Sequence, residues 1–134
     1  MNNVDLIRSC YAAFQRGDMK TIFDALDPAI DWVSNGDDKV IPWAGRRRGV
    51  EGAAAFFQAL GEALDFELFE PQDFHLSGDT VAVVGRTRAR VRASGGRFDS
   101  AWAHVFTVRN GRLVAFREFY DTLSIAGALR GAGA

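Results

Sequence analysis

The sequence predicts an α+β fold, in which N-terminal helices pack on one face of a strongly curved, mostly antiparallel sheet. Apolar residues recur at helical spacing in three stretches before residue 65, and from Phe66 onward they alternate with period two. Asn110-Gly111 separates two runs rich in aromatic and β-branched residues, which indicates a β-hairpin. Helices followed by strands favour an α+β arrangement. We expect a single domain over residues 1–134, because this length suits one hydrophobic core.

Two helices are expected at the N-terminus. The first covers residues 4–16, where apolar residues recur every three or four positions and Asn2 or Asn3 can cap the helix. Asp18 can cap a second, short helix that ends at Asp27-Pro28.

A strand, a loop and a third helix follow. The strand covers residues 29–34, with Ile30, Trp32 and Ser34 on one face. Residues 35–48 are polar and contain glycine, which predicts a loop. Residues 50–64 carry an apolar stripe, which predicts a helix.

The remaining chain is expected to form strands and a short tail. Residues 66–76 predict a strand that Pro71 interrupts, and residues 80–93 predict a long strand. Arginines occupy the outer face of that long strand, at positions Arg86, Arg88, Arg90 and Arg92. Residues 123–134 are rich in Ala and Gly, and we expect them to be frayed.

The hairpin from Ser100 to Thr122 allows two registers. A two-residue loop would place His104 opposite Arg117, whereas a three-residue loop over residues 109–111 would place it opposite Phe116. We prefer the second, because it gathers one large face that carries Trp102, His104, Phe106, Val108, Val114, Phe116, Glu118 and Tyr120. An imidazole and a carboxylate among aromatic rings predict a ligand pocket.

Composition limits the classes of function. The net charge of −1 gives no general attraction to nucleic acid or to an anionic membrane, so neither is an expected partner. The one cysteine excludes an internal disulfide and a cysteine zinc site, and no metal or cofactor is expected. The sequence has no long apolar run and no signal segment, and we expect a cytoplasmic protein.

Four stretches carry a resemblance to a known family. They are Tyr11 to Asp18 (YAAFQRGD), Ile41 to Gly45 (IPWAG), Trp102 to Phe106 (WAHVF) and Glu118 to Thr122 (EFYDT). Their order resembles the cystatin-like cone of the nuclear-transport-factor-2-like (NTF2-like) superfamily. Within it, the chain resembles a SnoaL-like protein of the group related to ketosteroid isomerase.

The resemblance implies a site. Polyketide cyclases of this superfamily use an acid on the last strand and a histidine on the strand before it, which correspond to Glu118 and His104. Glu replaces the Asp of those cyclases, so the carboxylate is one methylene farther from the backbone. Steroid isomerisation is disfavoured, because no acid stands near the end of the first strand. Epoxide hydrolysis is disfavoured, because Arg88 falls where a required acid would be.

Each candidate residue has two interpretations. Glu118 is either a desolvated general base or a structural acid paired with an arginine such as Arg86. His104 either orients Glu118, polarises a substrate carbonyl or transfers a proton, or it is a buried histidine bonded to a backbone carbonyl. Tyr11 either directs its hydroxyl to a substrate oxygen, where it would stabilise an enolate, or is an aromatic residue of the apolar stripe of the first helix, and Tyr120 is a candidate for a second donor. The alternative bases are Asp31 and Asp121, and the expected substrate-binding wall consists of Trp32, Trp43, Phe56, Trp102, Phe106 and Phe116.

The preferred function is a cofactor-independent enzyme that abstracts a proton next to a carbonyl of a small, mostly apolar compound, as in isomerisation, cyclisation or dehydration. One alternative is a binding module without turnover, and another is a dimerisation domain with an incidental pocket. We also expect a homodimer that forms through the sheet. The loop from Arg46 to Arg48 is either solvated or a site for an anionic ligand.

Overall fold

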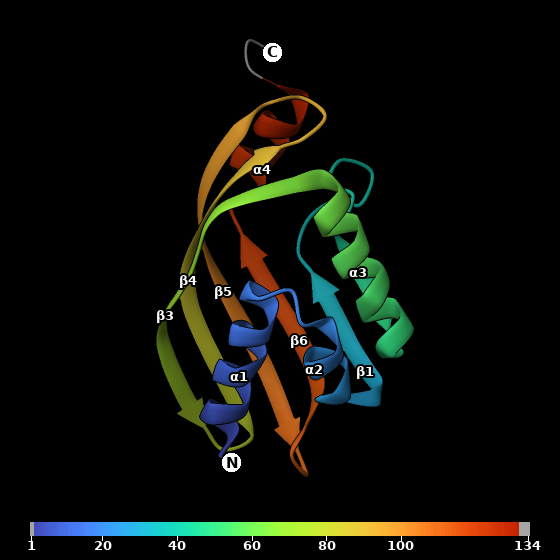
Figure 1. Ribbon diagram of the computed structural model, residues 1–134, viewed down its shortest axis with the longest axis vertical. Helices are drawn as coiled ribbons and strands as arrows, with labels where there is room; N and C mark the ends of the chain where they lie inside the picture. Colours follow the sequence, from blue (N-terminus) through green and yellow to red (C-terminus); the bar gives the residue numbers. More distant parts are fainter. Residues whose placement is uncertain (1, 132–134) are drawn as a thin grey trace.

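The computed structural model describes residues 2–131, in which helices cover one face of a curved six-stranded sheet (Figure 1). In chain order the elements are α1 (Asn3–Gln15), α2 (Met19–Asp24), β1 (Leu26–Ser34), β2 (Gly45–Arg48), α3 (Gly49–Ala63), β3 (Leu64–Ser77), β4 (Thr80–Val91), β5 (Arg97–Arg109), β6 (Arg112–Tyr120) and α4 (Thr122–Arg130). The predicted α+β fold is confirmed.

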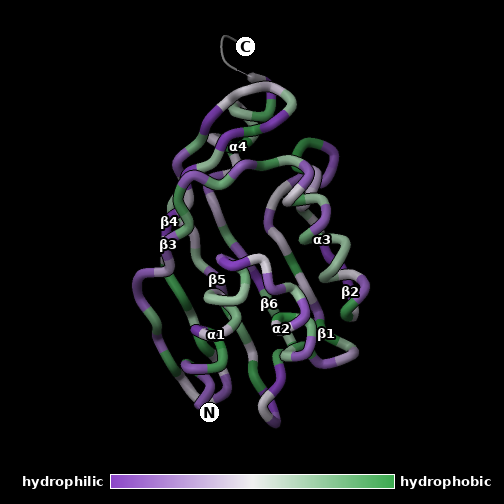
Figure 2. The backbone as a smooth tube through the Cα atoms, viewed as in Figure 1, coloured by the Kyte–Doolittle hydropathy of each residue, from purple (hydrophilic) through white to green (hydrophobic). Residues whose placement is uncertain are grey.

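The strands lie in the order β2-β1-β6-β5-β4-β3. β3 to β6 form an antiparallel meander, whereas β1 pairs in parallel with β6 and antiparallel with β2. Hydrophobic and hydrophilic segments alternate along the strands (Figure 2), as expected when one face is buried. α1, α2 and α3 lie over that buried face, so the core forms between them and the sheet (Figure 1).

The two N-terminal helices begin at the predicted caps. The side chain of Asn2 accepts a hydrogen bond from the backbone N–H of Asp5, and Asp18 accepts one from Thr21. The second helix ends at Asp24, earlier than expected. The chain then enters β1 directly, and Leu26 pairs with Leu113 of β6.

The hairpin register differs from the preferred prediction. Asn110 and Gly111 both have positive φ, 52° and 74°, so they form a two-residue turn between Arg109 and Arg112. Val114 is an extra residue in β6, which forms a bulge and shifts the pairing by one position.

This bulge corrects two parts of the prediction. His104 lies opposite Glu118, not opposite Phe116 or Arg117. Leu113 is buried in the core instead of Val114. The expectation that His104 and Glu118 share one face of the sheet is nevertheless confirmed, because both line the interior.

Two further elements differ from their predictions. The expected loop contains the edge strand β2, whose Arg46 makes two hydrogen bonds to Asp31, at 2.9 and 2.7 Å. β3 continues through Pro71, because the pairing with β4 is irregular there and β3 lies at the edge of the sheet.

The expectation of a frayed tail was wrong for residues 123–130, because they belong to α4. Asp121 caps this helix through Ser124, while Ile125 and Ala128 are buried. α4 docks closely, because a Cβ at Gly96 would overlap the backbone of Ala128. Residues 132–134 of the predicted tail lie outside the described residues.

Candidate functional site

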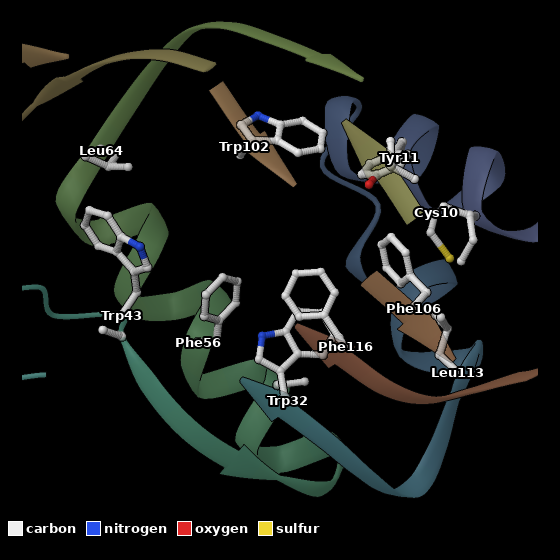
Figure 3. Close-up of a cluster of buried hydrophobic side chains, with 14 of the residues drawn as sticks. Cys10, Tyr11, Trp32, Trp43, Phe56, Leu64, Trp102, Phe106, Leu113 and Phe116 are labelled. Atoms are coloured by element: carbon white, nitrogen blue, oxygen red, sulfur yellow. The ribbon is translucent and has the colours of Figure 1, made fainter. Parts of the chain in front are cut away.

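A cavity of about 110 Å³ lies between the helices and the sheet. This is the order of size of cavities that hold a single aromatic ring. Side chains from α1, α3, β1, β5 and β6 surround it (Figure 3). All six predicted wall residues line the cavity, namely Trp32, Trp43, Phe56, Trp102, Phe106 and Phe116.

The catalytic candidates meet because three strands place them in one row. Glu118 of β6 is paired with His104 of β5 on one side and with Ser34 of β1 on the other. The three side chains point to the cavity face of the sheet, and all are largely buried. The structure therefore brings a carboxylate, an imidazole and a hydroxyl together at one wall.

His104 lies between Glu118 and Tyr11. Its Nε2 is 3.3 Å from Oε2 of Glu118, and its Nδ1 is 2.9 Å from the hydroxyl of Tyr11, which comes from α1. The neutral imidazole that satisfies both contacts carries its proton on Nε2, so Tyr11 donates to Nδ1. The interpretation of His104 as a histidine bonded to a backbone carbonyl is wrong, because both ring nitrogens contact side chains.

Trp102 supports His104 from one side. The two rings are stacked, with centroids 3.8 Å apart and planes at 15°. The indole N–H of Trp102 donates to Thr87 at 2.8 Å. Gly85 lies opposite Trp102, and a Cβ there would overlap the indole ring. The absence of a side chain at Gly85 therefore lets Trp102 lie flat against β4 and orient the imidazole.

Ser34 and Tyr120 hold the other side of Glu118. The hydroxyl of Ser34 is 2.6 Å from Oε1 of Glu118 and 3.0 Å from the hydroxyl of Tyr120. Tyr120 also donates to the backbone carbonyl of Asn35. All four predicted catalytic residues thus belong to one chain of contacts from Tyr11 to Asn35.

Burial controls the titration of three cavity residues. It raises the pKa of Tyr11 and of Tyr120, and the negative charge of Glu118 adds to both increases. The contact with the Ser34 hydroxyl opposes the increase in the pKa of Tyr120. Burial also raises the pKa of the Cys10 thiol to about 11. Both phenols and the thiol are therefore protonated at neutral pH.

The other acids and the arginines lie away from the cavity. Asp31 is paired with Arg46, which holds the pKa of that carboxyl below its usual range, and Asp121 caps α4. Arg86 forms its ion pair with Asp99, so the interpretation of Glu118 as its partner is wrong. Among the residues that line the cavity, Glu118 is the acid.

Sequence reasoning missed the role of Ser34. It was placed on the face of Ile30 and Trp32, but a serine in that position carries no distinctive signal. The available signal was the position of Ser34 as a small polar residue at the end of the apolar face of β1. The parallel pairing of β1 with β6, which places it beside Glu118, depends on tertiary structure.

Two observations concern ligands. The indole nitrogen of Trp32 is buried at the cavity wall without a hydrogen-bond partner in the part of the chain that the structure describes. Within residues 2–131, no group of three His, Cys, Asp or Glu side chains is arranged to hold a metal ion. In the same range, no helix combines the length and apolar composition needed to cross a membrane.

Comparison with known proteins identifies the family. Residues 7–116 match the SnoaL-like domain, so the chain belongs to this family, within the NTF2-like superfamily. An NTF2-like protein of Burkholderia xenovorans LB400 is 33% identical, with a TM-score of 0.86 and coverage of 95% of each chain. An NTF2-like protein of Burkholderia thailandensis E264 is 34% identical, with a TM-score of 0.85 and coverage of 93% of this chain and 95% of that one.

An uncharacterized protein of Mycobacterium tuberculosis is 29% identical over 118 residues, which are 88% of each chain. These matches confirm the resemblance that the four sequence stretches carried.

Proposed function

We propose that this protein is a cofactor-independent enzyme that removes a proton next to a carbonyl of a small, mostly apolar substrate. Glu118 is the general base, His104 is its partner, and the hydroxyl of Tyr11 stabilises the enolate oxygen. The observation that carries this proposal is the position of one carboxylate in the wall of an aromatic cavity, where it accepts a hydrogen bond from Ser34 and lies 3.3 Å from the imidazole of His104.

The surroundings of Glu118 support the role of a base. Ser34 and His104 occupy one carboxylate oxygen each and hold the group in one orientation. Both tyrosine hydroxyls donate within the protein, Tyr120 to the carbonyl of Asn35 and Tyr11 to His104. We assign the enolate donor to Tyr11, whose hydroxyl would turn from Nδ1 of His104 to the substrate oxygen. The unpartnered N–H of Trp32 also favours a ligand that carries an oxygen acceptor.

A deuterium-exchange assay with a panel of small ketones and enones tests the proposal. In heavy water, the wild type should exchange the hydrogen next to the carbonyl of at least one compound. Glu118→Gln keeps the size of the side chain but removes the basic carboxylate, so the rate should fall by about 10²-fold or more. His104→Asn should lower the exchange rate by a smaller factor than Glu118→Gln does.

Asp31→Asn is the matched control, because this acid is paired with Arg46 outside the cavity. It should keep the wild-type exchange rate. An unchanged rate in Glu118→Gln would mean that the base lies elsewhere.

A binding module without turnover is the second candidate. It is favoured by the contacts that Tyr11, His104, Glu118, Ser34 and Tyr120 make with one another, because these contacts already occupy their polar groups. A compound that binds tightly to the wild type while no member of the panel exchanges its hydrogen would support this candidate over the enzyme.

We also propose that the chain forms a homodimer through the outer face of the sheet. Val84, Ala103 and Phe119 form one row across β4, β5 and β6 on that face, and Val84 and Phe119 are 41% and 47% exposed. A row of exposed apolar side chains suits a contact with a second copy.

A further inference from the structure

The contacts between Glu118 and Asn35 form an unbroken line of four oxygens. Glu118 contacts Ser34 at 2.6 Å, Ser34 contacts Tyr120 at 3.0 Å, and Tyr120 donates to the carbonyl of Asn35. Ser34 is 1% exposed, so bulk water has no access to its hydroxyl. The hydrogens of this line must therefore come from the side chains themselves.

Counting these hydrogens gives two arrangements. The carbonyl of Asn35 can only accept, so the hydrogen of Tyr120 is directed to it, and Ser34 has one hydrogen for two neighbours. When Glu118 is ionised, Ser34 donates to it, and no hydrogen lies between Ser34 and Tyr120. When Glu118 is protonated on Oε1, Glu118 donates to Ser34 and Ser34 donates to Tyr120, so all three contacts become hydrogen bonds.

We propose that Ser34 is a positioning residue that holds Glu118 in both protonation states by rotating its hydroxyl between Glu118 and Tyr120. This inference rests on the proposed function, in which Glu118 gains a proton from the substrate. In that step a C–H bond breaks, its electron pair stays on the substrate as the enolate, and an O–H bond forms on Glu118. No covalent bond of Ser34 or Tyr120 changes.

The advantage for a base is that it keeps a hydrogen-bond partner before and after proton transfer. A buried carboxyl that lost its partner on protonation would leave an unsatisfied polar group, which is costly. A hydroxyl can donate or accept, so Ser34 matches both states, whereas a backbone N–H could not accept the hydrogen of a protonated Oε1.

The two tyrosines report on opposite sides of Glu118. The titratable groups that line the cavity beside it are Cys10 and Tyr11 from α1, His104 from β5 and Tyr120 from β6, and none comes from β1, β3, β4, α3 or α4. Tyr11 contacts Glu118 through His104, and Tyr120 contacts it through Ser34. The chain contains no other tyrosine.

Carbon-13 NMR of the ligand-free protein, labelled at tyrosine Cζ, tests the inference. Tyr11→Phe and Tyr120→Phe assign the two signals, and spectra are recorded between about pH 4 and pH 9, where Glu and His titrate. Both wild-type signals should shift in a common transition that Glu118→Gln abolishes. Ser34→Ala should reduce that shift at Tyr120 but retain it at Tyr11, and Ser34→Thr should restore it.

Two results would overturn the inference. One is a Tyr120 signal that shifts as much in Ser34→Ala as in the wild type, because the carboxylate would then act directly through space. The other is a wild-type Tyr120 signal without the transition that Glu118→Gln abolishes. If Ser34→Ala does not fold, Ser34→Cys replaces it, since its thiol is a weak donor and should reduce the shift.

The titration uses no substrate, so its outcome does not depend on turnover. If the protein exchanges a ketone hydrogen but the pH-dependent shift of the Tyr120 signal is the same with and without Ser34, only this inference is contradicted. If the shift of the Tyr120 signal depends on Ser34 but the protein exchanges no hydrogen, only the enzyme proposal is contradicted.

Discussion

Glu118 obtains its environment from single residues on the neighbouring strands. Ser34 and His104 contact its two oxygens, and Trp102 fixes the plane of His104 by stacking. Gly85 contributes indirectly to this environment, because its lack of a side chain leaves space for the indole of Trp102. Gly85 makes no hydrogen bond to Glu118 or His104 through a side chain. It nevertheless influences the orientation of Glu118, because it determines where Trp102 lies and Trp102 stacks on His104.

We expect Gly85→Ala to destabilise the protein by about 1–3 kcal/mol, the usual cost of overpacking a core. A Cβ at this position would overlap Trp102 and lie 2.6 Å from the carbonyl oxygen of Glu70, so either β3 or the indole must move. Urea denaturation measures the free energy of unfolding.

Gly61→Ala is the control for Gly85→Ala. Gly61 lies in α3 with open space around its Cα, so alanine should leave stability unchanged or raise it by about 0.5–1 kcal/mol. Equal free energies of unfolding for Gly85→Ala and the wild type would show that the core accommodates the methyl group.

At the scale of elements, α4 closes one end of the molecule. Its apolar side chains are few, and small residues dominate its sequence. Ser94 donates to the carbonyl of Ala128, and Gly96 allows the helix backbone to approach the sheet. Helices of this length are marginal in water, so the contacts with β4 and β5 hold α4 in place.

We expect Ile125→Ala to lower the free energy of unfolding by about 2–4 kcal/mol, as for other buried isoleucines. Ile125 is 3% exposed and lines the cavity, whereas Leu123 on the same helix is 79% exposed. Leu123→Ala should therefore stay within about 0.5 kcal/mol of the wild type. Similar losses for both variants, measured by urea denaturation, would contradict the observed docking of α4.

At the scale of the whole molecule, the two faces of the sheet have different roles. The inner face carries the cavity. On the outer face, Arg86 and Arg88 form ion pairs with Asp99 and Glu67 of the same chain. These arginines therefore have partners without a second copy, and the proposed dimer contact depends on the apolar row that contains Phe119.

Sedimentation velocity tests the dimer. The wild type should sediment as a dimer at micromolar concentration, and Phe119→Asp should shift it to monomer, because a carboxylate buried at an apolar contact is costly. Val40→Asp is the control, since Val40 is 48% exposed but lies in the loop before β2. A wild type that sediments as a monomer would exclude the proposed dimer at that concentration.

The sequence by itself determined the class of fold and most of the site. Period and caps placed α1 and α2, because these signals depend on residues close together in the chain. The common face of His104 and Glu118 was also predicted, although the structure produces it by a two-residue turn and a bulge and not by the expected three-residue loop. The aromatic residues of the cavity wall followed from alternation along the strands and from the family resemblance. Local pattern and resemblance therefore led to Tyr11, His104, Glu118 and Tyr120.

Tertiary structure alone decided which of these residues touch. The bulge at Val114 set His104 opposite Glu118, and the parallel pairing of β1 with β6 brought Ser34 beside the same carboxylate. Packing on Gly96 stabilised α4 in a stretch with weak local signals. Register, strand order and close backbone approach join residues far apart in sequence, and their energies depend on the assembled core, which no local pattern records.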